Sequence, residues 1–369
     1  MRQSGLDNGS AAAPPRPAPE GAPALSVDSL RAYYLMHYFG VEREVRAVDD
    51  ISLVVRPNEI YGLAGESSCG KTTFLKTIAA AVRPPLTVIG GSVRYGFLDR
   101  DIYSLSPAEL SAIRWRRLSY ITQGSMNVLN PVRRVRQSFI DFAYRHIRLR
   151  RGAFFAAVEQ HLQRLHLTAS VLEAYPHELS GGMKQRVTIA LATICRPEFI
   201  IADEPTTALD VIVQKDVLAM IREAQQQIGS SMLFVTHDMT VHANIADRLG
   251  IMYAGRLVEE APTAEIFTKP MHPYSAHLVA SLPRIGEQSR KKSLSGAPPN
   301  LADPPSGCRF HPRCSLATDV CREASPALTT LAPGHRVACY AASPLVKPSA
   351  TDDRAGGATK SAEPAGLVQ

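Results

Sequence analysis

The sequence predicts an α/β fold whose central sheet is mostly parallel and is covered by helices on both faces. Short apolar runs alternate with segments of helical periodicity, and "EIYGLAG", "EFIIADEP" and "SMLFVTHD" each hold about four consecutive apolar residues. Such runs are typical of strands that are buried on both faces. A glycine-rich loop follows the first run and precedes a helix, which is one strand, loop and helix unit of such a sheet.

The composition is that of an ordinary globular protein. With 369 residues, 45% of them hydrophobic and 20% charged, the chain is long enough for one large domain and a smaller one. No run of 18 or more apolar residues occurs, and the N-terminal sequence lacks the apolar stretch of a secretion signal. We therefore expect a cytoplasmic protein that does not span the membrane. The net charge of +7 comes from scattered lysines and arginines, which argues against nucleic acid as a partner.

Changes in composition divide the chain into four parts. Residues 1–25 and 344–369 are dominated by small and polar residues, and we expect both tails to be disordered. The stretch "SLPRIGEQSRKKSLSGAPPNLADPPSG" is polar and rich in Pro and Gly, which marks a linker. It separates a body at residues 26–280 from a cysteine-bearing extension at residues 281–343.

A capped helix is predicted between the first two apolar runs. In "SPAELSAIRWRR", Ser106 suits the N-cap and Pro107 the first helical position. Glu109 is placed to complete a capping box with Ser106. These residues predict where the helix begins.

The segment "GESSCGKTTFL" is a candidate phosphate loop, because it fits GxxxxGK[ST] between a strand and a helix. Its backbone N–H groups form a nest for a phosphate, and the helix N-terminus adds its positive dipole. Lys71 is placed to neutralise the β- and γ-phosphates, and Thr72 to hold Mg²⁺. Related loops usually carry Gly where this one has Ser68, so either a positive φ is not needed there or the loop is slightly strained. The expected nucleotide contacts are Gly65, Ser67, Ser68, Cys69, Gly70, Lys71, Thr72 and Thr73.

A second apolar run ends in two adjacent carboxylates. In "FIIADEPTTALD", a strand delivers Asp203 and Glu204 to the C-terminal edge of a parallel sheet, where α/β folds bind ligands. Asp203 is a candidate Mg²⁺ ligand, and Glu204 is a candidate base for an attacking water. An acidic pair after an apolar run is common, and it gains meaning here from the phosphate loop.

The segment "LSGGMKQRV" provides a second helix start that can receive an anion. Ser180 suits the N-cap, and Gly181 and Gly182 open the helix. One nucleotide cannot use both this helix start and the phosphate loop of the same subunit. These residues resemble the signature of ATP-binding cassettes, the ABC family.

Other motifs complete the resemblance to that family. Gln123 in "YITQGSMN" resembles the Q-loop, Asp210 in "ALD" the D-loop, and His237 in "FVTHD" the switch histidine. The resemblance implies a P-loop (RecA-like) ABC ATPase core with an antiparallel β subdomain and an α-helical subdomain at about residues 125–178. It also implies a head-to-tail dimer that binds two ATP molecules.

The family resemblance assigns a role to each motif. Ser180, Gly181 and Gly182 serve the ATP of the partner subunit. Glu204 polarises water and His237 contacts the γ-phosphate, while Gln123 senses Mg²⁺, whose ligands are Thr72, Gln123 and Asp203. Asp210 belongs to the same nucleotide-binding set.

An aromatic residue upstream of the phosphate loop is expected to stack on adenine. The stretch "LRAYYLMHYFG" offers several candidates. We favour Tyr34 over Tyr33 and Tyr38.

Two further segments narrow the resemblance to ATPase subunits of the oligopeptide/dipeptide/nickel importers. They are "SMNVLNPVRRV" after the Q-loop and residues 251–284, which contain "HPY". The family implies two permease subunits, a second cassette that is commonly a paralogue, and an extracytoplasmic solute-binding protein. The chain is then expected on the cytoplasmic face of the cell membrane.

We favour peptides as the imported substrate, and oligosaccharides, nickel chelates and opines are the alternatives. A soluble cassette factor that acts on ribosomes or DNA is the alternative from another class. Such factors carry two cassettes or a coiled-coil insertion, and neither is present here.

Four cysteines, Cys308, Cys314, Cys321 and Cys339, lie near the end of the chain with 5, 6 and 17 residues between them. They could be small buried residues, a zinc site or the ligands of an iron–sulfur cluster. Zinc sites usually show cysteine pairs with shorter spacing. The resemblance favours a [4Fe–4S] cluster, because the corresponding cysteines in some members of the family ligate one.

Overall fold

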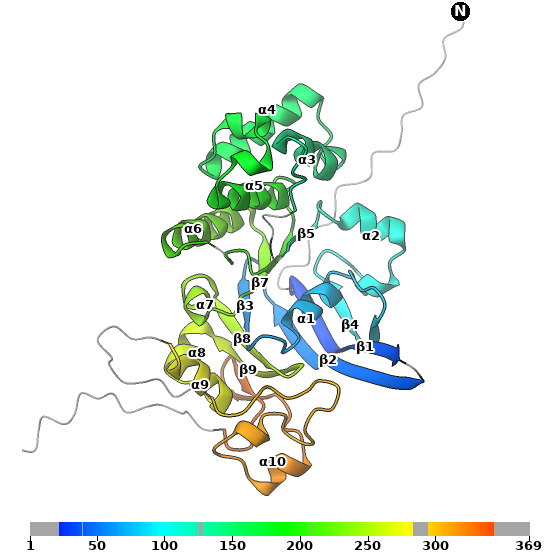
Figure 1. The fold of residues 1–369 in the computed structure, drawn as a ribbon, viewed down its shortest axis with the longest axis vertical. Helices are drawn as coiled ribbons and strands as arrows, with labels where there is room; N and C mark the ends of the chain where they lie inside the picture. Colours follow the sequence, from blue (N-terminus) through cyan, green and yellow to red (C-terminus); the bar gives the residue numbers. More distant parts are fainter. Residues whose placement is uncertain are drawn as a thin grey trace, which may run out of the picture.

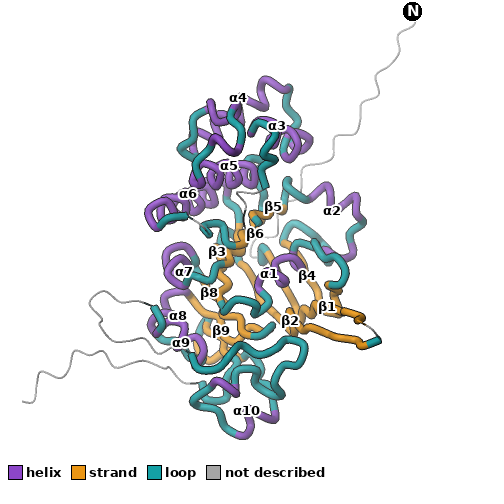
Figure 2. Tube along the Cα trace, in the orientation of Figure 1, coloured by secondary structure: helices purple, strands orange, loops and turns teal. Residues whose placement is uncertain are grey.

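The computed structural model arranges the chain around two sheets, with a helical region at one end and the cysteine-bearing extension at the other (Figures 1 and 2). Within the part of the chain that is described, no helix combines the length and the apolar character needed to cross a bilayer. The described residues are 22–38, 40–122, 124, 128–207, 209–282 and 294–342.

The larger sheet contains the predicted parallel strands. Its order is β10-β11-β9-β8-β3-β7-β6-β5, and the neighbours from β8 to β5 pair in parallel. Every residue of β3 (Ile60–Ala64), β6 (Phe199–Asp203) and β7 (Ser231–Val235) is buried. The prediction of three buried parallel strands is therefore confirmed. The other bounds are Leu118–Ile121 for β5, Arg248–Tyr253 for β8 and Arg256–Pro262 for β9.

The smaller sheet is antiparallel and has the order β2-β1-β4. Helix α1 (Lys71–Ile78) contacts β1 and β2 as well as β6, so it lies between the two sheets. Leu25, the last residue of the expected N-terminal tail, begins β1 and is fully buried. The strands are β1 (Leu25–Tyr38), β2 (Val41–Val55) and β4 (Leu86–Tyr95).

Helix α2 (Pro107–Ile113) begins with the predicted cap. The Glu109 N–H donates to Ser106 Oγ at 3.3 Å, and the Ser106 N–H donates to the Glu109 carboxylate at 2.8 Å. The predicted capping box is confirmed, and it satisfies two backbone donors at the start of the helix.

Helices α3, α4 and α5 lie together at one end of the molecule (Figure 1). They share an apolar core in which Phe139, Phe154, Val158 and Leu162 are fully buried. The remaining helices are α3 (Val135–Phe142), α4 (Arg151–Arg164), α5 (Gly181–Thr193), α6 (Val211–Ile228), α7 (Met239–Ile245), α8 (Thr263–Thr268), α9 (Pro273–Ala280) and α10 (Asp319–Glu323).

The extension adds two strands, β10 (Thr329–Ala332) and β11 (His335–Val337), to the larger sheet. β11 pairs antiparallel with β9, and Arg336 lies opposite Glu260. The extension is thus joined to the body by backbone hydrogen bonds. Part of the predicted linker, residues 283–293, lies outside the described residues.

A buried ion pair fastens β11 to the body. His335 Nε2 lies 2.7 Å from Glu259 Oε1, and each side chain is at most 1% exposed. The hydrogen bond to Glu259 raises the pKa of His335 and outweighs the opposing effect of burial. Glu259 also accepts the backbone N–H groups of Met271 and His272, so its carboxylate is well satisfied.

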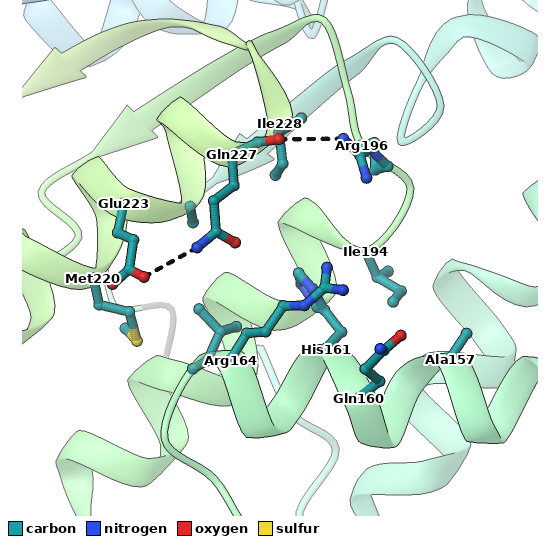
Figure 3. A pocket seen from close by; sticks show the side chains of 12 residues that line it. Ala157, Gln160, His161, Arg164, Ile194, Arg196, Met220, Glu223, Gln227 and Ile228 are labelled. Atoms are coloured by element: carbon teal, nitrogen blue, oxygen red, sulfur yellow. Dashed lines mark hydrogen bonds between the residues drawn. The ribbon is translucent and has the colours of Figure 1, made fainter.

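A pocket of about 230 Å³ lies where α4 meets α6 (Figure 3). His161 Nε2 is 2.9 Å from Thr193 Oγ1. Elsewhere in the wall, Arg196 donates to the carbonyl of Gln227 at 3.2 Å. Burial lowers the pKa of His161 to about 4, so this imidazole is neutral at pH 7. The pocket contains none of the predicted site residues.

Acidification is expected to weaken the helical region through His161. The pKa of His161 in the folded chain is about 4, below its ordinary value of 6.5, so the unfolded chain takes up the proton first as the pH falls. The free energy of unfolding should therefore fall between pH 6.5 and 4, by up to about 3 kcal/mol from this residue. His161→Gln should lose less stability over that interval in urea titrations. His242 and His272, whose pKa values burial also lowers to about 4, leave a residual decline.

The exposed His37 provides the matched control for this titration. His37→Gln should follow the wild-type curve between pH 6.5 and 4. Equal pH dependence for His161→Gln and the wild type would contradict the assignment of a neutral buried His161.

Candidate active site

Two glycines of the candidate phosphate loop are required by close backbone approach. Gly65 has φ 153° and Gly70 has φ 106°. A Cβ on Gly65 would lie 2.1 Å from the carbonyl oxygen of Met252, and one on Gly70 would lie 1.9 Å from that of Ala47. No side chain fits at either position, so the loop between β3 and α1 depends on both glycines.

Ser68 adopts the left-handed backbone conformation, with φ 64°. Of the two alternatives that the sequence left open, the structure therefore contains the strained one. The strain costs about 1 kcal/mol relative to glycine. Ser67 and Ser68 are both exposed at the mouth of the loop.

The side chain of Lys71 is buried within the loop. Its ammonium donates to the carbonyl oxygens of Gly65 at 2.6 Å and Glu66 at 2.8 Å. Cys69 Sγ lies 3.6 Å from the same nitrogen. Burial raises the pKa of Cys69 in spite of this positive charge, so Cys69 stays a neutral thiol.

Asp203 and Thr72 meet beside the first turn of α1. Asp203 ends β6 and is 2% exposed, and it lines one cavity together with Thr72. Asp203 Oδ2 accepts from the Tyr120 hydroxyl at 3.3 Å, while Oδ1 has no hydrogen-bond partner among the described residues. Burial raises the pKa of Asp203. A buried carboxylate with an orphaned oxygen next to a hydroxyl fits a hard cation such as Mg²⁺.

Glu204 and His237 form a pair at the ends of neighbouring strands. His237 Nδ1 lies 3.1 Å from Glu204 Oε1, and the Thr207 hydroxyl donates to Glu204 Oε2 at 2.9 Å. Burial alone would raise the pKa of Glu204, but these hydrogen bonds hold it below its ordinary value. Glu204 therefore carries a negative charge at neutral pH. Its φ of 48° is a strained conformation of the kind that clusters at functional sites.

Tyr34 lies next to the helix that follows the phosphate loop. Its hydroxyl is 3.1 Å from Thr73 Oγ1 in α1. Tyr33 faces the opposite side of β1, where it is buried and donates to Asp49. The side chain of Tyr38 lies outside the described residues. Of the two described candidates, Tyr34 is thus the one placed at the loop.

The signature and D-loop residues begin two neighbouring helices. Ser180 caps α5, accepting from the Met183 N–H at 3.3 Å, and Asp210 caps α6, accepting from the Val213 N–H at 2.9 Å. Gly181 and Gly182 form the first turn of α5. Gln123 and Ala208 lie outside the described residues.

Three contacts at the site were not found from the sequence. They involve Tyr120 with Asp203, Thr207 with Glu204, and the Tyr274 hydroxyl, which accepts the Glu66 N–H at 2.8 Å. Thr207 belongs to the "DEPTT" motif and could have been suspected. Tyr274 lies 208 residues from Glu66, and "HPY" indicated a family without indicating this contact.

The four C-terminal cysteines line one small, enclosed pocket together with Phe310. All four are free thiols. Burial raises the pKa of Cys308 and Cys314, and raises that of Cys339 to about 11. The described part of the chain contains no group of three or more His, Cys, Asp or Glu side chains that could hold a metal ion. The structure thus brings the cysteines together, but the described residues show no preformed metal site.

Two family profiles match successive parts of the chain. The profile of the ABC transporter family matches residues 48–207, and the profile of the oligopeptide/dipeptide transporter C-terminal region matches residues 258–321. The first match holds the phosphate loop, the signature and the acidic pair. The second holds three of the four cysteines and ends before Cys339.

Similar proteins and structures agree with these profiles. The chain is 36% identical to the dipeptide transport ATP-binding protein DppD of Caldanaerobacter subterraneus, over 86% of this chain and 96% of that protein. It is also 36% identical to the oligopeptide transport ATP-binding protein OppD of Salmonella typhimurium, over 86% and 93%. A dimeric bacterial ABC transporter cassette shares the fold, with a TM-score of 0.56, 23% identity and coverage of 65% and 98%. The chain therefore belongs to the oligopeptide/dipeptide family of ABC transporter ATP-binding proteins.

Proposed function

We propose that this chain is the ATP-hydrolysing subunit that energises a peptide importer. The observation that carries the proposal is the meeting of the phosphate loop, Asp203 and the Glu204–His237 pair at one edge of the parallel strands. The names of the similar proteins add the substrate class, since they describe dipeptide and oligopeptide transport. ATP hydrolysis thus supplies the free energy, and a peptide is the transported solute.

The loop residues bind the triphosphate. The N–H groups of residues 65–71 and the dipole of α1 receive the β-phosphate, and Lys71 neutralises the β- and γ-phosphates. Tyr34 stacks on the adenine. Thr72 and Asp203, together with Gln123, would hold Mg²⁺, which would screen the negative charge of the phosphates.

Glu204 acts as the base for the attacking water. The Thr207 hydroxyl donates to Glu204 Oε2, and His237 Nδ1 lies 3.1 Å from Oε1. These contacts orient the ionised carboxylate, which is the acceptor for the proton of the water. His237 is 59% exposed and extends into solvent from the end of β7, where it can reach a γ-phosphate.

A second cassette completes the site. Ser180, Gly181 and Gly182 open α5 and are directed to the nucleotide of the partner. Val211 and Ile212, next to the D-loop, are 79% and 78% exposed, which is unusual for adjacent apolar residues and favours a protein contact. We place the partner cassette there, as a paralogue of this chain.

The permease subunits bind near the Q-loop and the helical region, which puts the chain on the cytoplasmic face of the cell membrane. A cavity of about 570 Å³ extends from Thr72 and Asp203 at the nucleotide site to Thr122, the residue before Gln123. Val132, which follows the Q-loop, is 80% exposed. An apolar side chain exposed to this degree suits a contact with another protein, which we take to be the permease. The solute-binding protein acts through the permeases from the other side of the membrane.

Replacement of the base should separate ATP binding from transport. In the importer reconstituted with its permeases and solute-binding protein, Glu204→Gln should still bind ATP, but hydrolysis should fall at least about 100-fold and peptide uptake should stop. Labelled peptide uptake and phosphate release are the two measurements.

Glu198 is the matched control, because it stands at the other end of β6 and pairs with Arg117 on the surface. Glu198→Gln should retain both activities. Wild-type hydrolysis by Glu204→Gln would contradict the assigned base. ATP-driven uptake of another solute, without peptide uptake, would contradict the substrate class.

We also propose that Cys308, Cys314, Cys321 and Cys339 bind a [4Fe–4S] cluster. Four free thiols around one pocket supply the donor set of such a cluster. The four cysteines would hold the cluster as thiolates. Because burial raises the pKa values of Cys308, Cys314 and Cys339, cluster binding would release protons.

Anaerobic reconstitution with iron and sulfide tests the cluster. The wild type should gain broad visible absorption and about four iron atoms per chain. Cys308→Ser should lose most of both, while Cys195→Ser, outside the pocket, should behave as the wild type. A colourless protein that binds one zinc ion, or no metal, would contradict the cluster.

A further inference from the structure

The segment from Cys308 to Cys314 connects the extension with the phosphate loop. Its last arginine, Arg313, forms a bidentate ion pair with Glu66, the second residue of that loop. Arg313 Nη1 lies 2.8 Å from Glu66 Oε2, and Nη2 lies 3.0 Å from Oε1. The side chain of Arg313 is only 6% exposed, and that of Glu66 is 25% exposed. Bidentate pairs of this kind fix orientation as well as charge.

The guanidinium of Arg313 is held by contacts on its other sides. Nη1 also donates to the Tyr253 hydroxyl at 3.3 Å, and Nε donates to the carbonyl of Ser295 at 3.2 Å. The carbon of the guanidinium lies 5.8 Å from the centre of the Tyr253 ring. Arg313 is therefore a fixed support for Glu66.

Glu66 links this support to the phosphate-binding lysine. The N–H of Glu66 donates to the Tyr274 hydroxyl at 2.8 Å, and its carbonyl accepts from Lys71 Nζ at 2.8 Å. The side chain, the N–H and the carbonyl of one residue are thus all engaged. Loss of the side-chain contact would remove one of the three restraints on Glu66, whose carbonyl holds Lys71.

The start of the segment is anchored to the body as well. Arg309 is 6% exposed, and it binds the carboxylate of Asp49 and the carbonyl of Ala254. Phe310 packs against Tyr253 and Tyr274, with ring centres 5.1 and 5.4 Å apart. Because both ends of the segment are held by contacts with the body, the position of Arg313 is restricted.

We propose that Arg313 is a positioning residue for nucleotide binding, which acts through Glu66 on the phosphate loop. It has two effects. It fixes the loop around Glu66, and it neutralises a carboxylate that would otherwise face a triphosphate from within the loop. The proposal rests on ATP binding at this loop, and it depends neither on the peptide substrate nor on the cluster.

The two effects predict a characteristic difference between the two partners. Arg313→Met leaves the negative charge of Glu66 close to the bound phosphates, so both effects are lost. Glu66→Gln removes the carboxylate together with the repulsion, so it should weaken binding less. In the Glu66→Gln background, Arg313→Met should then have little further effect.

Titration of the full chain with a fluorescent ATP analogue, and kinetics of the assembled importer, measure these effects. Arg313→Met should raise the Kd for ATP about tenfold. KM should rise in parallel, while kcat at saturating ATP should stay within about twofold of the wild type. Arg313→Lys, which keeps the charge but loses the bidentate geometry, should restore part of the affinity.

Arg322 provides the matched control, because it belongs to the same extension and its side chain is 62% exposed. Arg322→Met should leave both Kd and kcat unchanged. Wild-type affinity in Arg313→Met, or an equal loss of affinity from Arg313→Met in the Glu66→Gln background, would overturn the proposal. Circular dichroism identifies any variant that does not fold.

Glu66→Asp tests the same pair without a change in the extension, should Arg313→Met fail to fold. The shorter side chain keeps the charge but cannot span the bidentate contact, so ATP affinity should fall several-fold. Unchanged affinity would overturn the proposal. A wild-type chain that binds no ATP would instead refute the proposed function.

Discussion

The site depends on one constraint: the C-terminal ends of the parallel strands β3, β7 and β6 are aligned in register. Leu63 of β3 lies opposite Val235 of β7, and Val235 lies opposite Asp203 of β6. The phosphate loop, the acidic pair and the switch histidine each follow one of these strand ends. A register shift of one residue in β6 would move Asp203 away from Thr72 and turn it to the other face of the sheet. The close packing of these fully buried strands opposes such a shift and therefore holds the candidate catalytic groups together.

Features that depend on local pattern could be predicted from the sequence. The apolar runs that form β3, β6 and β7 each span only a few neighbouring residues, and so does the capping box at Ser106. The phosphate loop could also be predicted from the sequence, but its backbone conformation could not. Only the structure could show that Ser68 adopts φ 64°. The residue type determines how costly a positive φ is, but it does not determine whether the folded loop adopts it.

Features that depend on distant parts of the chain could not be predicted in this way. Arg313 and Glu66 are 247 residues apart, and neither belongs to a pattern that names the other. The pairing of β11 with β9 could not be predicted either, because β11 contains only three residues and is too short to show a strand pattern. The family resemblance suggested a cluster at the four cysteines, whereas only the folded structure shows that they share one pocket.

Charge explains why the extension and the body behave as one unit. The extension supplies an arginine to three acids of the body, with Arg309 on Asp49, Arg313 on Glu66 and Arg336 on Glu260. Asp49 and Glu260 are 5% and 1% exposed, so without these arginines part of their charge would be buried and uncompensated. Asp49 also pairs with Arg256 of the body, and Glu260 with Arg248, so the arginines of the extension strengthen buried ion pairs without being the sole partners. These pairs stabilise the extension on the body and keep Arg313 at the phosphate loop.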